Sequence, residues 1–200
     1  MELLVFALAV GAIWFFNRRA QLRRVHLLAG ILGKFQVERL METVADGYLR
    51  AVGEQDPQRS QQVWGVLDQA EATLRDQIRG FADTVSKLDA TQTRFSTLPV
   101  ALPFALQLFP QAGADLRALL RIHSDGVERL VRNEGNLGRR DKAYMLTAEL
   151  LLLQHSCHWF CRSKAVASAR MMARHRTPHA QLVACVSEPT RKAYQQLISA

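Results

Sequence analysis

The first 24 residues constrain this chain more than any other stretch, because they place an uncharged apolar run directly before a cluster of arginines. The run from Leu3 to Phe16 contains 14 residues without a charge. As a helix it covers about 21 Å at 1.5 Å per residue. The hydrocarbon core of a bilayer is about 30 Å thick and is normally crossed by about 20 apolar residues. Such a short run is compatible with a membrane anchor, a cleaved signal peptide or a buried core helix.

The residues on either side of the run favour the anchor. A signal peptide needs positive charge before its apolar stretch, whereas here Glu2 precedes the run and arginines follow it. Aromatic residues at the end of the run stand where an interfacial belt would lie, and arginine side chains can reach the headgroups. We therefore predict a transmembrane anchor over residues 1–18. The flanking residues expected at its inner end are Trp14, Arg18, Arg19, Arg23 and Arg24.

The charge asymmetry also predicts an orientation. Lys and Arg residues beside a membrane helix stay on the cytoplasmic side. Because all the flanking positive charge follows the run, we expect the N-terminus outside and residues 17–200 in the cytoplasm. In a bacterium this describes a single-pass protein of the inner membrane. The three cysteines agree with it, because an odd, small number is no disulfide framework and the cytoplasm keeps thiols reduced.

The rest of the chain has the pattern of helices separated by proline and glycine, and no segment alternates like a β-strand. We predict an all-α fold in which the anchor continues into a juxtamembrane helical stalk over residues 19–55. A cytoplasmic antiparallel helical bundle then follows over residues 56–200. Within it we expect a helix capped by Asp56, a helix over 114–133, a left-handed turn over 133–138, a long helix over 139–175 and two short terminal helices.

One predicted helix of the bundle has the cleanest apolar period in the chain, with steps of three or four residues along a narrow seam. Such a seam must lie against another helix. The ordinary explanation is packing within the bundle, and the alternative is a contact with a second copy or a partner protein. The predicted interaction seam consists of Val63, Leu67, Leu74, Ile78, Phe81 and Val85.

Residues 98–110 are apolar but contain three prolines, so they cannot form a long regular helix. They are also too few to span a bilayer. We expect a short helix that caps the core between bundle helices. The alternative is a surface that dips into the membrane interface.

Reactive side chains are densest near the middle of the predicted long helix. Cys157, His158 and Cys161 fall within about 100° of one another on a helical face. With a fourth ligand they could bind zinc, so a metal-, haem- or redox-responsive sensor is the alternative function. Their spacing, however, matches no standard zinc or haem pattern. Cysteine usually packs as a small hydrophobe, so we expect core packing and no cofactor.

The sequence gives little reason to expect an enzyme. It contains no Gly-x-Ser-x-Gly elbow and no phosphate-binding glycine loop. The adjacent His, Ser and Asp at 123–125 point in different directions on a helix and cannot form a relay. Glu149 precedes four leucines, and we expect a basic partner for it, such as Arg140 or Lys142.

The net charge of +8 is concentrated in the second half of the chain, where no acidic residue occurs between Glu149 and Glu188. Such a field attracts anionic headgroups, nucleic acid or acidic proteins. Nucleic acid is disfavoured because stacking aromatics and a recognition motif are missing, and a simple solvated face is the ordinary explanation. The basic patch consists of Arg162, Lys164, Arg170, Arg174 and Arg176.

Taken together, the anchor, the stalk and the seam lead us to expect a membrane-anchored adaptor or scaffold. It would bind lipid through its N-terminal helix and a protein partner, or a second copy, through its bundle.

Overall fold

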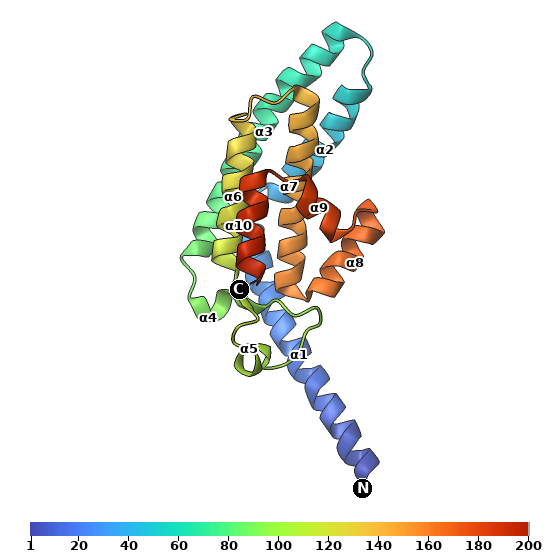
Figure 1. The fold of residues 1–200 in the computed structure, drawn as a ribbon, viewed down its shortest axis with the longest axis vertical. Coiled ribbons are helices and arrows are strands. Elements are labelled where there is room, and N and C mark those ends of the chain that lie inside the picture. The colour runs from blue at the N-terminus through green and yellow to red at the C-terminus, as the bar shows by residue number, and fades with distance from the viewer. Residues whose placement is uncertain (200) are drawn as a thin grey trace.

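The computed structural model describes residues 1–199, which are mostly helical, with ten helices and one pair of short strands (Figure 1). The helices are α1 (Glu2–Leu32), α2 (Val37–Gly53), α3 (Pro57–Ser86), α4 (Ala90–Thr93), α5 (Ala105–Leu108), α6 (Leu116–Val131), α7 (Arg139–Cys161), α8 (Lys164–His175), α9 (His179–Cys185) and α10 (Glu188–Ser199). The strands are β1 (Arg94–Ser96) and β2 (Gly113–Asp115), paired antiparallel with Phe95 opposite Ala114. The mostly helical fold is confirmed, whereas this small sheet was not predicted.

Helix α1 runs without a break from the N-terminus into the bundle. Its N-terminal half projects alone from the other helices (Figure 1). Its last turns pack on the bundle through Leu28 and Ile31, which are buried. The helix ends at Leu32, and α2 begins after a short connection and packs along α3. The segment predicted as a stalk, residues 19–55, therefore consists of the end of α1 and a second helix that lies within the bundle.

The core of the bundle lies between α3, α6 and α7, and α7 is the central helix. It contacts α1, α2, α6, α8 and α9, so side chains on most of its circumference face other helices and can be apolar. Leu150, Leu152 and Leu153 are buried, as the run of leucines predicts.

Two predicted local signals are confirmed. The Asp56 carboxylate caps α3 by accepting hydrogen bonds from the backbone N–H of Gln58 at 2.9 Å and of Arg59 at 3.4 Å. Between α6 and α7, Asn133 and Asn136 have left-handed backbones with φ of 53° and 51°. Asparagine tolerates this conformation better than most residues, which explains the turn at this place.

The long helix predicted over residues 139–175 is wrong at one point, because α7 and α8 are separate helices. Arg162 leaves the helical region with φ −130° and ψ −93°. The Ser163 hydroxyl then accepts a hydrogen bond from the backbone N–H of Val166 at 3.3 Å and so caps α8. The backbone N–H of Ala165, in the first turn of α8, is satisfied by the carbonyl of Pro99 at 2.9 Å.

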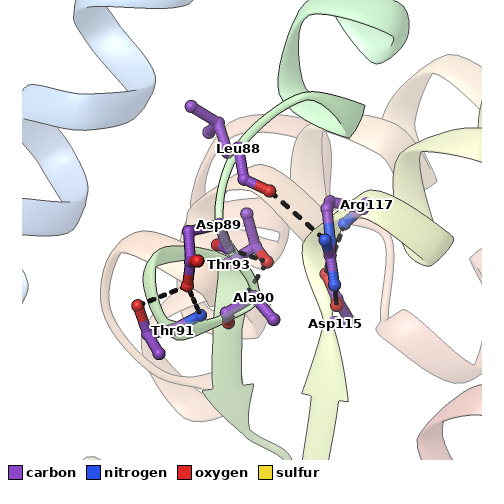
Figure 2. Close-up of polar contacts among 7 residues, drawn as sticks. All are labelled: Leu88, Asp89, Ala90, Thr91, Thr93, Asp115 and Arg117. Atoms are coloured by element: carbon purple, nitrogen blue, oxygen red, sulfur yellow. Dashed lines mark hydrogen bonds and ion pairs between the residues drawn. The ribbon is translucent and has the colours of Figure 1, made fainter.

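Residues 97–112 form a loop whose base is closed by the strand pair. The backbone N–H of Thr97 donates to the carbonyl of Ala112 at 2.9 Å. Figure 2 shows the polar contacts beside this base. Arg117 donates to both carboxylate oxygens of Asp115, with a shortest distance of 2.6 Å, and reaches the carbonyl of Leu88 at 3.2 Å. The end of α3 is thereby tied to the strand pair.

The short helix expected within residues 98–110 is present as α5, but its expected role as a cap on the core is wrong. Ala105 is buried, whereas Phe104 and Leu108 are 59% and 66% exposed. The three prolines prevent the segment from lying along the bundle as a regular amphipathic helix. Most of its large apolar side chains face outward.

Candidate membrane-contact site

The N-terminal arm, defined here as residues 2–22 of α1, exposes apolar side chains that water does not favour. Leu3, Leu8 and Trp14 are 86%, 66% and 59% exposed. Among residues 1–199, α1 is the one helix long and apolar enough to cross a membrane, and none of its most apolar 18 residues is buried. The uncharged run from Leu3 to Phe16 rises about 21 Å, and the arm as far as Leu22, which includes Arg18 and Arg19, rises about 30 Å, the thickness of a bilayer core. An exposed apolar surface of this size marks a contact with a membrane or a partner.

The four arginines that follow the apolar run do not share one environment. Arg18, Arg19 and Arg23 are exposed, and the guanidinium of Arg18 lies 5.1 Å from the centre of the Trp14 ring. Arg24 instead packs over the ring of Phe160 on α7, at 5.8 Å. The change from the exposed arm to the packed part of α1 therefore falls between residues 22 and 28.

A shallow hollow of about 460 Å³ lies beside the arm where it meets the bundle. Two guanidinium groups, an indole ring and two amides line it, together with one leucine. Arg162 is fixed there because it donates to the Gln21 side chain at 2.8 Å. Guanidinium groups bind phosphate well, and indole rings favour the boundary between headgroups and hydrocarbon. The lining residues are Trp14, Asn17, Arg18, Gln21, Leu22 and Arg162.

The predicted basic patch is divided between packed and free side chains. Arg162 belongs to the hollow beside α1, and the Lys164 ammonium lies 5.1 Å from the centre of the Trp159 ring. Arg170, Arg174 and Arg176 are exposed on α8 and at its end. Charge alone did not reveal this division, because it depends on the break between α7 and α8.

The predicted seam of α3 packs within the chain. Leu67, Leu74, Ile78, Phe81 and Val85 are buried, and Val63 is partly buried against the same core. Helix α3 lies against α2 and α6, so the seam closes in the ordinary way. Its buried side chains offer no area to a partner protein.

The structure does not gather Cys157, His158 and Cys161 into a ligand set, and across residues 1–199 no group of three or more His, Cys, Asp or Glu side chains is placed to hold a metal ion. All three cysteines of the chain are free thiols. Burial raises the pKa of Cys157 to about 12 and that of Cys161 to about 11. Both therefore stay protonated at neutral pH, where a thiolate would be needed for metal binding or fast redox chemistry.

A different polar cluster, which the sequence did not predict, lies inside the bundle. Three histidines from α6, α7 and α9 each have a hydroxyl partner at 2.8–3.1 Å; the pairs are His123–Ser156, His155–Ser168 and His179–Tyr194. The rings of His155 and His179 also stack, with centres 4.3 Å apart. The one usable signal was the position of His123 on the apolar face of its helix.

Burial keeps these histidines neutral. It lowers the pKa of His123 and His155 to about 3 and, together with Lys164, that of His179 to about 4. Neutral imidazole can donate with one nitrogen and accept with the other, which suits pairing with hydroxyl groups. At neutral pH the cluster therefore acts as a hydrogen-bonded part of the core.

Glu149 is fully buried, and its predicted basic partners are wrong. It accepts hydrogen bonds from the backbone N–H of Ser187 at 3.2 Å and from the Ser187 hydroxyl at 2.9 Å. Burial raises the pKa of this carboxyl, although the hydrogen bonds from Thr190 and Ser187 oppose the rise.

Lys142, one of the partners predicted for Glu149, pairs with a different carboxylate. It lies 2.5 Å from the carboxylate of Glu71 on α3, which also accepts a hydrogen bond from the Tyr48 hydroxyl at 2.6 Å. Sequence spacing could not reveal partners that come from distant helices.

Comparison with protein-family models, curated proteins and solved structures finds no match to this chain. Its function is therefore inferred from exposure, charge and geometry. The N-terminal arm is the region where those three properties are most unusual.

Proposed function

We propose that this protein is a single-pass membrane protein whose helical bundle serves as an adaptor or scaffold in a complex of the inner membrane. The observation that carries the proposal is the N-terminal arm, an exposed helix whose apolar run is followed by the exposed Arg18, Arg19 and Arg23. Full burial of a Val, Leu, Ile or Phe side chain contributes about 1.5–3 kcal/mol. A lipid surrounding therefore stabilises this arm far more than water does.

The charges support an orientation with the N-terminus outside and the bundle in the cytoplasm. Glu2 is the one charged side chain before the apolar run, and Arg18, Arg19 and Arg23 follow it in exposed positions. Positive charge beside a membrane helix is retained on the cytoplasmic side. The bundle follows the arginines and is expected on the same side.

The continuity of α1 supports a role in positioning a partner. One unbroken helix joins the arm to Leu28 and Ile31, which are packed in the bundle core. The bundle is thereby attached to the arm without a flexible connection.

The end of the bundle that lies opposite the N-terminus is the turn between α2 and α3 (Figure 1). Leu49 on α2 and Val66 on α3 are 76% and 73% exposed, and we expect a protein partner to contact them.

The test is purification of the full-length protein from membranes in a mild detergent. We expect one other protein to co-purify at a fixed ratio, and the double variant Leu49→Asp, Val66→Asp to lose it. Met172→Asp is the control, because Met172 is also exposed but lies on α8. A full-length protein that purifies alone, or as a homo-oligomer with nothing attached, would contradict the adaptor role.

A further inference from the structure

We propose that the apolar loop, defined here as residues 98–109, is a second membrane-contact element that inserts beside the N-terminal arm. Its occupant is the lipid bilayer, at the boundary between headgroups and hydrocarbon on the bundle side. The inference rests on the proposed membrane anchoring of the arm and adds a second point of attachment to it.

The composition of the loop suits lipid. No charged residue occurs between Arg94 and Asp115. Within this uncharged stretch, five large apolar side chains are 40–66% exposed. They are Val100, Leu102, Phe104, Leu108 and Phe109. Soluble proteins seldom gather so many exposed large apolar side chains in twelve residues.

The apolar loop is continuous with the N-terminal arm. The Asn17 side chain donates to the carbonyl of Ala101 at 2.6 Å. The rings of Phe16 and Phe104 pack with their centres 5.8 Å apart. Figure 1 shows α5 close to α1 at the end of the bundle from which the arm emerges. The loop therefore extends the exposed apolar surface of the arm sideways, at the level of Phe16.

The exposure of the loop is built into the fold, because hydrogen bonds hold the start of the loop and the strand before it against the bundle. The indole N–H of Trp159 donates to the carbonyl of Ser96 at 3.2 Å, and the carbonyl of Pro99 accepts from the backbone of Ala165. At Phe104 the backbone is left-handed, with φ of 58°, which is costly for a bulky residue. The fold thus keeps the ring of Phe104 outward, against Phe16 of the arm.

The length of the apolar run puts the loop at the right depth. Leu3 to Phe16 covers about 21 Å, less than the bilayer core of about 30 Å. A short span is accommodated by thinning of the bilayer and by snorkelling of the flanking residues. Phe16 and the loop that touches it are then drawn to the boundary, where interfacial segments bury their apolar faces.

The charges around the loop favour lipid over a protein partner. Arg18 and Arg162 line the hollow beside the arm, and Arg19 is exposed one residue further along α1. An apolar surface bordered by cations matches a leaflet that contains anionic lipids.

The experiment places one environment-sensitive NBD fluorophore at a time on the full-length protein in vesicles of phosphatidylethanolamine and phosphatidylglycerol. The variants Leu8→Cys, Leu108→Cys and Tyr144→Cys report on the arm, the loop and the start of α7. These side chains are matched, at 66%, 66% and 63% exposed. All variants carry Cys185→Ser, because Cys185 is exposed whereas Cys157 and Cys161 stay protonated at neutral pH and react slowly.

We expect the labels at Leu8 and Leu108 to emit at shorter wavelength in vesicles and to be quenched by a spin-labelled lipid. The label at Tyr144 should show neither effect. A shifted label at Leu8 with a label at Leu108 that behaves like the one at Tyr144 would overturn the loop proposal and leave the anchor intact. A label at Leu8 that stays in water would overturn the anchor itself and, with it, the loop proposal.

Discussion

The N-terminal arm and the interior of the bundle depart from the usual distribution of side chains in opposite directions. The arm carries apolar side chains in the open, with Leu3 at 86% and Leu8 at 66% exposed. The interior carries polar side chains out of reach of water, with His123 and Glu149 at 0%. Folded proteins normally avoid both arrangements.

The difference between the two regions lies in where the compensating partners are. Each of these two buried side chains has a partner on the chain itself, Ser156 for His123 and Ser187 for Glu149, although the Nδ1 atom of His123 has none. The apolar side chains of the arm have no comparable partners on the chain, since none of its most apolar 18 residues is buried. The chain therefore supplies partners for the polar groups of its interior, whereas the exposed apolar side chains of the arm need a surrounding that the chain does not supply. Changes in the interior should alter the free energy of unfolding, and changes in the arm should alter membrane attachment.

The strongest effect in the interior is expected from Lys142→Met. This change leaves the Glu71 carboxylate buried without its cation, which typically costs about 3–5 kcal/mol of unfolding free energy. Denaturant unfolding in detergent, followed by circular dichroism, measures the loss. Lys192→Met is the control, because the Lys192–Glu188 pair is exposed and should matter little. Equal losses of unfolding free energy in the two variants would show that Lys142 does not pair with a buried Glu71 carboxylate.

The strongest effect on the arm is expected from Leu8→Asp. A charged residue near the middle of a membrane helix costs about 3 kcal/mol of insertion free energy. The variant should shift from the membrane to the soluble fraction while its bundle unfolds at the same denaturant concentration. Leu49→Asp puts the same charge on a side chain of similar exposure in α2, so it should stay with the membrane. Retention of both variants at the wild-type level speaks against an inserted arm.

The closeness of packing around Glu149 is tested by Gly126→Ala. A methyl group at Gly126 would lie 2.5 Å from the Thr190 hydroxyl and 2.9 Å from the Glu149 carboxylate. We expect a loss of about 1–3 kcal/mol in unfolding free energy from this overpacking. Gly65→Ala in α3 meets nothing within 4 Å and should stabilise the helix by about 0.4–1 kcal/mol. A neutral or stabilising Gly126→Ala would show that Thr190 of α10 and Glu149 of α7 do not approach Gly126 of α6 this closely.

The neutral histidines predict a dependence of stability on pH. Because burial lowers the pKa of His123 to about 3, the unfolded chain binds this proton first as the pH falls below about 6.5. The stability that neutral His123 contributes is complete above that pH and is lost towards pH 3, by at most about 1.4 kcal/mol per pH unit. The raised pKa of Glu149 acts in the opposite direction, since protonation of that carboxyl favours the folded state.

The variant His123→Gln separates these two contributions. It should be less stable at pH 7 and should lose less stability than the wild type between pH 6.5 and pH 5. Unfolding curves at several pH values measure the two slopes. Parallel slopes would mean that His123 is already charged or solvated in the folded protein.

Features governed by nearby residues could be predicted from the sequence. The apolar run, the cap at Asp56 and the left-handed asparagines at 133 and 136 depend on the order of neighbouring residues, and each is present where it was expected. The period of the α3 seam also indicated its buried face correctly, because helical spacing is a local property.

Features that depend on distant residues could not be predicted. His123 and Ser156 are 33 residues apart, and the Glu71–Lys142 pair joins α3 to α7. The exposure of Phe104 likewise follows from how its loop meets α1 and α8 rather than from its composition. The break at Ser163 was missed because the helical pattern continues on both sides of it.

Alkaline carbonate extraction of membranes that contain the full-length protein tests the central claim most directly. This treatment releases proteins held by charge or by other proteins and leaves helices inserted in the bilayer. An inserted N-terminal arm predicts that the protein remains in the membrane pellet. Complete release into the supernatant would contradict it and would assign the exposed face of the arm to a protein partner.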